Sequence, residues 1–146
     1  MTPFSAESLI REFWRLMATN DFGSVATVLA EDFVLEWPQS CERFRGPENF
    51  CRMNAEYPHH GVWTFEIQRL LAQGDAVVTD VLVADGVQNG RAISFFTVLD
   101  GKIVRIVEFW PEPFKAPAHR AHLVDHSACR DTDIVTSLRD DQPYEA

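Results

Sequence analysis

The spacing of hydrophobic positions changes near residue 62, from a helical period to the alternation typical of strands. After Ser5, which can cap a helix, apolar residues recur three and four positions apart, at Leu9, Ile10, Phe13, Trp14, Leu16 and Met17. This predicts a first helix that ends before Asn20–Gly23. A second short helix is expected over about residues 22–30. A third is expected over 47–56, where Pro47 suits a first helical turn.

From Val62 onward the pattern predicts four strands, at about residues 62–72, 75–85, 91–99 and 102–110. Their connections are short, and Asp100-Gly101 between two apolar runs is a strong signal for a β-hairpin. We therefore expect an antiparallel meander. An extended segment over 31–38 and a polar loop over 39–46 come before it. Helices followed by a curved sheet give an α+β fold, with the helices against one face.

The end of the chain differs in composition from the rest. Three prolines within residues 111–117 predict an extended segment that lies over the body, and residues 119–122 a helical turn. From about Ser127 the sequence is polar and acidic. We expect a single domain over residues 1–124 and an acidic polar tail over 125–146 that is mobile or ordered by a partner.

The composition indicates a cavity and argues against several classes of partner and site. Eleven Phe and four Trp are more aromatic residues than a core of this size needs, so some are expected to line a cavity, while most serve ordinary packing. The net charge of −9 argues against nucleic acid and anionic membranes as partners. Three cysteines without a C-x-x-C pair fit neither a disulfide framework nor a zinc site. With no signal peptide or membrane-length apolar run in this sequence, we expect a cytoplasmic protein.

The strongest candidate for chemistry is Glu108, a carboxylate within an apolar strand. Alternation places it on the same face as Ile106 and Trp110. Such a charge is costly to bury unless it is paired or useful. Between apolar walls its pKa would be raised, which suits general acid/base catalysis near neutral pH. The alternatives are an ion pair with Arg91 or Arg43, or a solvated position near the end of the strand.

Three further segments carry a resemblance to a known family. They are Ala30-Glu31-Asp32-Phe33, the helix start Gly46-Pro47-Glu48, and the final hairpin with Asp100–Ile103 and Glu108–Trp110. Over residues 5–114 the chain resembles the nuclear-transport-factor-2-like superfamily, in particular its SnoaL-like branch. The resemblance implies a cone-shaped, antiparallel or mixed curved β-sheet wrapped around the N-terminal helices, as in a cystatin-like α+β barrel. It also implies an apolar pocket with one open end, and a homodimer.

The resemblance implies more than one kind of function. Ketosteroid isomerase, scytalone dehydratase, limonene epoxide hydrolase and the polyketide cyclases place acid/base residues inside this pocket. We therefore expect a small cofactor-independent isomerase, cyclase or dehydratase acting on an apolar, oxygenated small molecule. The alternative is a non-catalytic module of the same fold, which binds a ligand or serves in dimeric assembly.

The resemblance also bears on individual residues. Glu108 aligns with the catalytic aspartate of the epoxide hydrolase, and Trp37, Trp110, Leu35 and Phe96 are expected to form the substrate-binding wall. Trp37 packed in the core is an equal alternative.

Asp80 is a further catalytic candidate, since on the inner face it would form a carboxylate pair with Glu108. The epoxide hydrolase carries an arginine and an aspartate on this strand, where the best register here gives Val81 and Val83. In that register Asp80 faces outward, toward a dimer surface, and epoxide hydrolysis is disfavoured.

Tyr57 and His59 complete the set of catalytic candidates, in a loop expected near the mouth of the pocket. Tyr57 would donate a hydrogen bond to a substrate oxygen, and His59, next to His60, would transfer a proton; a solvated histidine pair is the alternative. The five histidines lack ligand spacing, so no metal is expected. No glycine-rich phosphate loop or strained nucleophile turn occurs in the sequence, and no cofactor is expected.

Overall fold

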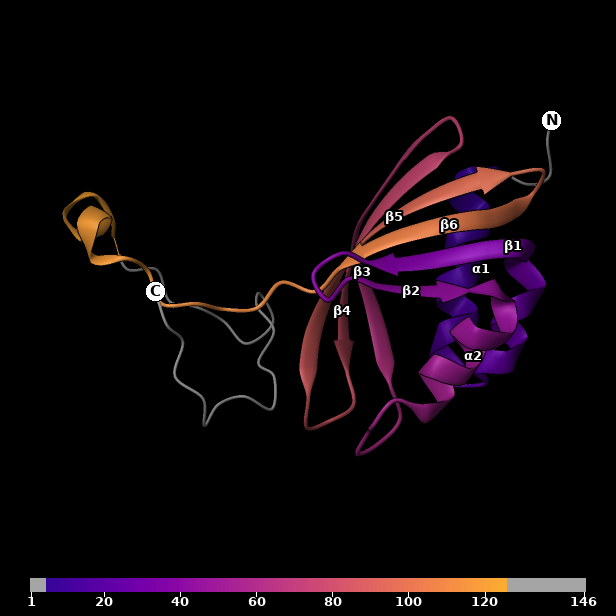
Figure 1. Cartoon of the computed structure of the whole chain (residues 1–146), viewed down its shortest axis with the longest axis horizontal. Helices are drawn as coiled ribbons and strands as arrows, with labels where there is room; N and C mark the ends of the chain where they lie inside the picture. The colour runs from indigo at the N-terminus through magenta and orange to yellow at the C-terminus, as the bar shows by residue number, and fades with distance from the viewer. Residues whose placement is uncertain (1–4, 126–146) are drawn as a thin grey trace.

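The computed structural model describes residues 5–125 as three helical segments on one face of a curved sheet, followed by an extension (Figure 1). The helical segments are α1 (Ala6–Ala18), the 3₁₀ helix η1 (Phe22–Val28) and α2 (Gly46–Glu56). The strands are β1 (Leu29–Trp37), β2 (Glu42–Arg45), β3 (Thr64–Gln73), β4 (Ala76–Ala84), β5 (Asn89–Leu99) and β6 (Lys102–Phe109). A second 3₁₀ helix, η2 (Ala118–Leu123), lies in the extension.

Helix α1 forms as its sequence predicts. The Ser5 hydroxyl accepts a hydrogen bond from the Ser8 backbone N–H at 3.1 Å, which caps the first turn. The helix packs against β3 and β4 with the apolar face that the spacing indicates, and the buried residues are Leu9, Ile10, Phe13, Trp14 and Met17. This face, Phe33 of β1, Phe96 of β5 and Phe50 of α2 belong to the core.

The strands form one mixed sheet in the order β2-β1-β6-β5-β4-β3. Strands β3 to β6 are antiparallel neighbours, as the meander requires, whereas β1 lies parallel to β6. The sheet curves around the helices without closing, because β2 and β3 remain its two ends (Figure 1). The expected α+β cone of helices and curved sheet is confirmed.

Two local predictions were wrong. The second helix is of the 3₁₀ type and ends at Val28, so β1 begins earlier than expected. The polar segment expected as a loop contains β2, which pairs antiparallel with β1. Its sequence is charged and carries no strand pattern; backbone pairing and the contact of Phe44 with Trp37, at 4.9 Å between ring centroids, hold it in place.

The extension after β6 also departs from expectation. Residues 111–117 have no regular structure and run away from the sheet instead of lying over it (Figure 1). Phe114 in this segment is 69% exposed. The expected helical turn is present in η2. The acidic segment from residue 126 onward, with His126 and Cys129, lies outside the described residues, so the division at residue 124 stays a prediction. Within residues 5–125 no helix is long and apolar enough to cross a membrane.

Candidate functional site

A cavity of about 180 Å³ opens between the helices and the concave face of the sheet. All four tryptophans of the chain line it, namely Trp14, Trp37, Trp63 and Trp110. They come from α1, the end of β1, the residue before β3 and the residue after β6. A protein cavity of roughly 150 Å³ accommodates benzene. The space therefore fits one ring with a few substituents.

The rest of the lining is mostly apolar. Phenylalanines from both helices, from η1 and from β3 contribute to it: Phe13, Phe22, Phe50 and Phe65. The polar lining residues are Asn54, Tyr57, Gln88, Asn89, Glu108 and Glu112. No lysine, arginine or histidine of the described chain belongs to this lining, so two carboxylates set the charge of the cavity.

Glu108 reaches the cavity because of the alternation along β6. Ile106 and Glu108 face the helices and are buried, while Arg105 points outward and is exposed. Ser94 of β5 lies directly opposite Glu108 in the sheet register, on the same face. The placement that the sequence predicts for Glu108 within its strand is therefore the observed one.

Three side-chain donors hold the Glu108 carboxylate. The indole N–H groups of Trp37 and Trp110 both donate to Oε1, each at 3.1 Å, and the Ser94 hydroxyl donates to Oε2 at 2.7 Å. A carboxylate oxygen offers about two acceptor positions. Oε1 is thus fully used, and Oε2 retains one position for a proton or a ligand.

Burial raises the pKa of Glu108 above its ordinary value, and the hydrogen bonds from Ser94, Trp37 and Trp110 only partly offset this effect. The same three side chains, Trp37, Trp110 and Ser94, can also hold the protonated form of Glu108. The carbonyl Oε1 keeps both indole donors, and the acid proton resides on Oε2, where Ser94 can turn to accept it. The site can therefore hold Glu108 in either protonation state, as a proton-transferring group requires.

The two arginines considered as partners of Glu108 pair with other carboxylates. Arg91 binds Asp80 with two hydrogen bonds, of 2.8 Å from Nε and 2.6 Å from its terminal nitrogen. Arg43 of β2 lies 3.5 Å from Glu36 of β1, at the other end of the strand order from Asp80 and Arg91.

Asp80 does not line the cavity, and the carboxylate pair with Glu108 is not formed. Its neighbours Thr79 and Val81 face the helices and are fully buried, so the alternation of β4 sends Asp80 to the outer face. Val83 shares the inner face and lines the cavity. This is the outward register in which the strand lacks the epoxide hydrolase pair.

Of the two loop candidates, Tyr57 belongs to the cavity lining and His59 does not. Tyr57 lines the cavity mouth, where its ring contacts Trp63 at 6.0 Å between centroids. His59 is not in the lining; its Nδ1 lies 3.2 Å from the Gly61 carbonyl oxygen, and the residue lines a separate hollow with Asn20, Asp21 and Phe22. His119 and His122 lie on η2 and are not in the lining either.

Among the four expected wall residues, Trp37 and Trp110 line the cavity, while Leu35 and Phe96 do not. Leu35 and Phe96 face inward as expected, but they are 1% and 2% exposed and belong to the packed core. The ring of Phe13, which lines the cavity, lies against Phe96 at 5.3 Å between centroids. The helix layer therefore fills the space that a ligand would need to reach Phe96.

The sequence did not indicate several residues of the site. They are Ser94, Gln88, Asn89 and Glu112, together with Phe13 and Trp14 of α1. The α1 residues were predicted as helix core, and nothing in their spacing distinguishes a cavity wall from packing. Within residues 5–125 no cluster of three or more His, Cys, Asp or Glu side chains has the arrangement to hold a metal ion.

Comparisons with known proteins agree with this geometry. Residues 10–106 match the model of the SnoaL-like domain family. A solved structure of a proposed ketosteroid isomerase from Kribbella flavida DSM 17836 is 33% identical, with a TM-score of 0.77 over 85% of this chain and 90% of that one. An NTF-2 like protein of unknown function from Burkholderia xenovorans LB400 is 23% identical, with a TM-score of 0.68 over 84% and 95% of the two chains.

An LEH-like epoxide hydrolase of M. tuberculosis is also 23% identical, with a TM-score of 0.59 over 72% of this chain and 81% of that one. At that identity the likeness concerns the fold alone. A comparison of the sequence with curated proteins finds no match.

Proposed function

This chain belongs to the SnoaL-like domain family, and we propose that it is a small cofactor-independent enzyme that uses general acid/base catalysis. Its substrate is an apolar, oxygenated small molecule, and its reaction is of the isomerase, cyclase or dehydratase type. The observation that carries this proposal is Glu108, whose carboxylate is held by Trp37, Trp110 and Ser94. It is a carboxylate with a raised pKa, in an apolar cavity, with one acceptor position left on Oε2.

In the proposed reaction Glu108 moves one proton. Oε2 takes a proton from the substrate, and the two indole N–H groups stabilise the carboxyl group through Oε1 in both of its states. For an isomerisation, the electron pair of the broken bond shifts within the substrate, and Oε2 returns the proton to a second atom. Proton number and charge are then balanced without a co-reactant.

The cavity narrows the choice of substrate. Its volume of about 180 Å³ suits a single ring, so a four-ring steroid would have to extend through the mouth. Without a basic residue in the lining, carboxylates and phosphates are disfavoured. In the register that the family resemblance implies, Val81 and Val83 take the places of the arginine and aspartate of the epoxide hydrolase, so proton transfer at carbon or oxygen fits better than epoxide hydrolysis.

The test measures proton transfer directly. In D₂O, exchange of the α protons of cyclohexanone should be faster with the protein than without it, and proton NMR follows the exchange. Glu108→Gln should abolish the acceleration and keep the fold, because glutamine preserves the shape of the side chain. Glu66→Gln, at an exposed position of β3, is the matched control and should behave as the unaltered protein. Full acceleration in Glu108→Gln would refute the role of Glu108.

Binding without catalysis is the second candidate, and one observation favours it. Every described buried side-chain polar atom has a hydrogen-bond partner, and Glu108 is held by three, as a structural polar group would be. A ligand that saturates the cavity without any α-proton exchange would support this second function over the first.

The proposal includes a homodimer formed through the outer face of the sheet. Leu71, Phe95 and Leu99 are 70%, 44% and 57% exposed on β3 and β5, and Phe95 contacts Phe109 on the same face. Exposed apolar side chains gathered on one face are typical of an interface. Sedimentation velocity at micromolar concentration should give a dimer, and Phe95→Arg should give a monomer. A monomer before substitution would count against this partner.

A further inference from the structure

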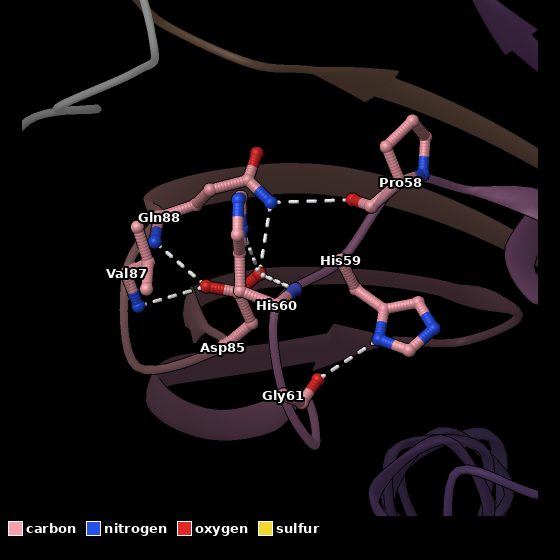
Figure 2. Close-up of polar contacts among 7 residues, drawn as sticks. All are labelled: Pro58, His59, His60, Gly61, Asp85, Val87 and Gln88. Carbon is pink, nitrogen blue, oxygen red and sulfur yellow. Dashed lines mark hydrogen bonds and ion pairs between the residues drawn. The ribbon is translucent and has the colours of Figure 1, made fainter.

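Another buried carboxylate, Asp85, lies at the turn between β4 and β5, next to the cavity-lining residues Gln88 and Asn89. The Asp85 side chain is completely shielded from solvent. Its Oδ1 accepts the backbone N–H groups of Val87 and Gln88, at 2.9 and 2.6 Å. Its Oδ2 accepts hydrogen bonds from the His60 backbone N–H and the Gln88 side-chain amide, both at 2.8 Å (Figure 2). Asp85 thus joins two segments that are distant in sequence.

The contact between these segments is close. A Cβ atom on Gly61 would lie 2.8 Å from the Asp85 carbonyl oxygen, so the loop fits only with glycine there. Burial alone would raise the pKa of Asp85, but the hydrogen bonds from Gln88, His60 and Val87 outweigh it and hold the pKa well below its ordinary value. Asp85 therefore remains an acceptor throughout the physiological pH range.

Gln88, which lines the cavity, takes its orientation from this arrangement. Its Nε2 donates to Asp85 Oδ2 at 2.8 Å and to the Pro58 carbonyl oxygen at 3.2 Å. Both partners can only accept, so the amide nitrogen must face them. The carbonyl Oε1 of Gln88 points away from both, as Figure 2 shows. Oε1 is the amide atom that remains for a ligand.

Asn54 and Glu108 also present acceptors to the cavity, whereas the Tyr57 hydroxyl and the Asn89 amide can donate. Asn54 donates from Nδ2 to the Phe50 carbonyl oxygen at 2.9 Å, which ties down its amide nitrogen. Glu108 contributes a carboxylate, and Lys, Arg and His are missing from the described lining. A ligand that donates a hydrogen bond can satisfy the oxygen atoms of Gln88 and Glu108, which a ligand that only accepts cannot do.

We infer that the cavity selects a ring-sized apolar alcohol through Gln88, whose carbonyl oxygen accepts the ligand hydroxyl, and that Asp85 is the positioning residue that orients Gln88. The inference rests on the proposed function for the location of the ligand, and it deepens that function by naming the group that is recognised. It does not depend on Glu108 being a base.

The test compares two probes of equal size, cyclohexanol and cyclohexanone, of which only the alcohol donates a hydrogen bond. All four tryptophans line the cavity, so tryptophan fluorescence reports binding at this place directly. Cyclohexanol should bind roughly three- to tenfold more tightly, the ratio that one neutral hydrogen bond supports. Equal affinities, tighter binding of cyclohexanone, or no binding of either probe would overturn the inference.

Two variants assign the preference to its residues. Gln88→Leu should remove the preference for the alcohol and leave cyclohexanone binding in place. Asp85→Asn places an amide nitrogen among donors, so Gln88 loses its fixed orientation and the preference should fall although cyclohexanone still binds. Gln73→Leu, an exposed position at the end of β3, is the matched control.

A purely structural role for Asp85 would lower both affinities together, whereas a positioning role changes their ratio. An unchanged preference in Gln88→Leu would overturn the assignment. Retention of α-proton exchange in Glu108→Gln would overturn the proposed catalysis alone, so the two failures remain distinguishable.

Discussion

Replacing Glu108 by glutamine should change how the stability of the protein depends on pH. Burial raises the pKa of Glu108 in the folded state above the ordinary value of 4.5. Below that value the carboxyl group is protonated in both the folded and the unfolded chain, and it contributes no pH dependence. As the pH rises from 4.5 through the folded pKa, the unfolded chain releases the proton first, so the free energy of unfolding falls.

The size of the effect follows from linkage. Each pKa unit of difference between the two states costs about 1.4 kcal/mol once the pH exceeds the folded pKa, and the slope cannot exceed that amount per pH unit. Glutamine carries no proton to lose and keeps acceptor and donor positions for Trp37, Trp110 and Ser94. The variant should therefore gain stability relative to the unaltered protein between pH 5 and pH 8.

Urea unfolding followed by tryptophan fluorescence measures this difference without knowledge of the substrate. Both proteins contain the same histidines and surface carboxylates, so their titration cancels when the two are subtracted at each pH. Glu66→Gln, exposed on β3, should follow the unaltered protein. A difference between Glu108→Gln and the unaltered protein that stays constant from pH 5 to pH 8 would refute the raised pKa and, with it, the acid/base argument.

Three further predictions test the packing and the cysteines. Phe13→Ala removes a fully buried ring from the core and should lower the free energy of unfolding by about 3–5 kcal/mol in a urea titration; a loss under about 1 kcal/mol would contradict the described core. Gly61→Ala brings a methyl group within 2.8 Å of the Asp85 carbonyl oxygen and should destabilise by about 1–3 kcal/mol, whereas a neutral result would mean that this loop can move aside. Burial raises the pKa of the Cys51 thiol, and Cys41 is exposed, so iodoacetamide at pH 8 should label Cys41 before Cys51 in peptide mass spectrometry; the reverse order would contradict the placement of α2.

The architecture was largely predictable because its signals are local. Asp100 and Gly101 adopt positive φ angles of 52° and 74°, the backbone that a two-residue hairpin turn requires and that their residue types favour. Alternation then fixed the four long strands to within a few residues. Strand β2 was not predicted, because its pairing with β1, and not its own sequence pattern, makes it a strand.

The face of Glu108, Trp37 and Leu35 on their strands was predictable, whereas the face of Asp80 was left open and the depth of each side chain was not predictable. Alternation placed Glu108, Trp37 and Leu35 on the inner face, but all inner positions look alike in sequence. Whether an inner side chain meets a ligand or a helix depends on where α1 lies, and that depends on long-range packing. Leu35 was therefore assigned to the cavity although the core encloses it.

Ser94 shows a different limit. Counting pairs from the turn, where Leu99 faces Lys102, would place Ile93 opposite Glu108. The register shifts by one residue between Thr97 and Val98, and this bulge brings Ser94 opposite Glu108 instead. A bulge changes which face a side chain occupies, so the hydroxyl partner of Glu108 could not be identified from an idealised hairpin.

Asp85 and Glu108, two of the three buried carboxylates of the described chain, show that burial alone does not decide which group does chemistry. Asp85 and Glu108 are 5% and 7% exposed, yet the pKa of the first is lowered and that of the second raised. Three backbone N–H groups and one amide compensate Asp85, with donors on both oxygens. Glu108 receives three side-chain donors, and two of them share one oxygen. Asp85, whose charge is fully compensated, stabilises the loops at the mouth of the cavity. Glu108, whose charge is only partly compensated, retains an oxygen at which a proton can be exchanged. This contrast is the physical reason to seek catalysis at Glu108 and ligand selection beside Asp85.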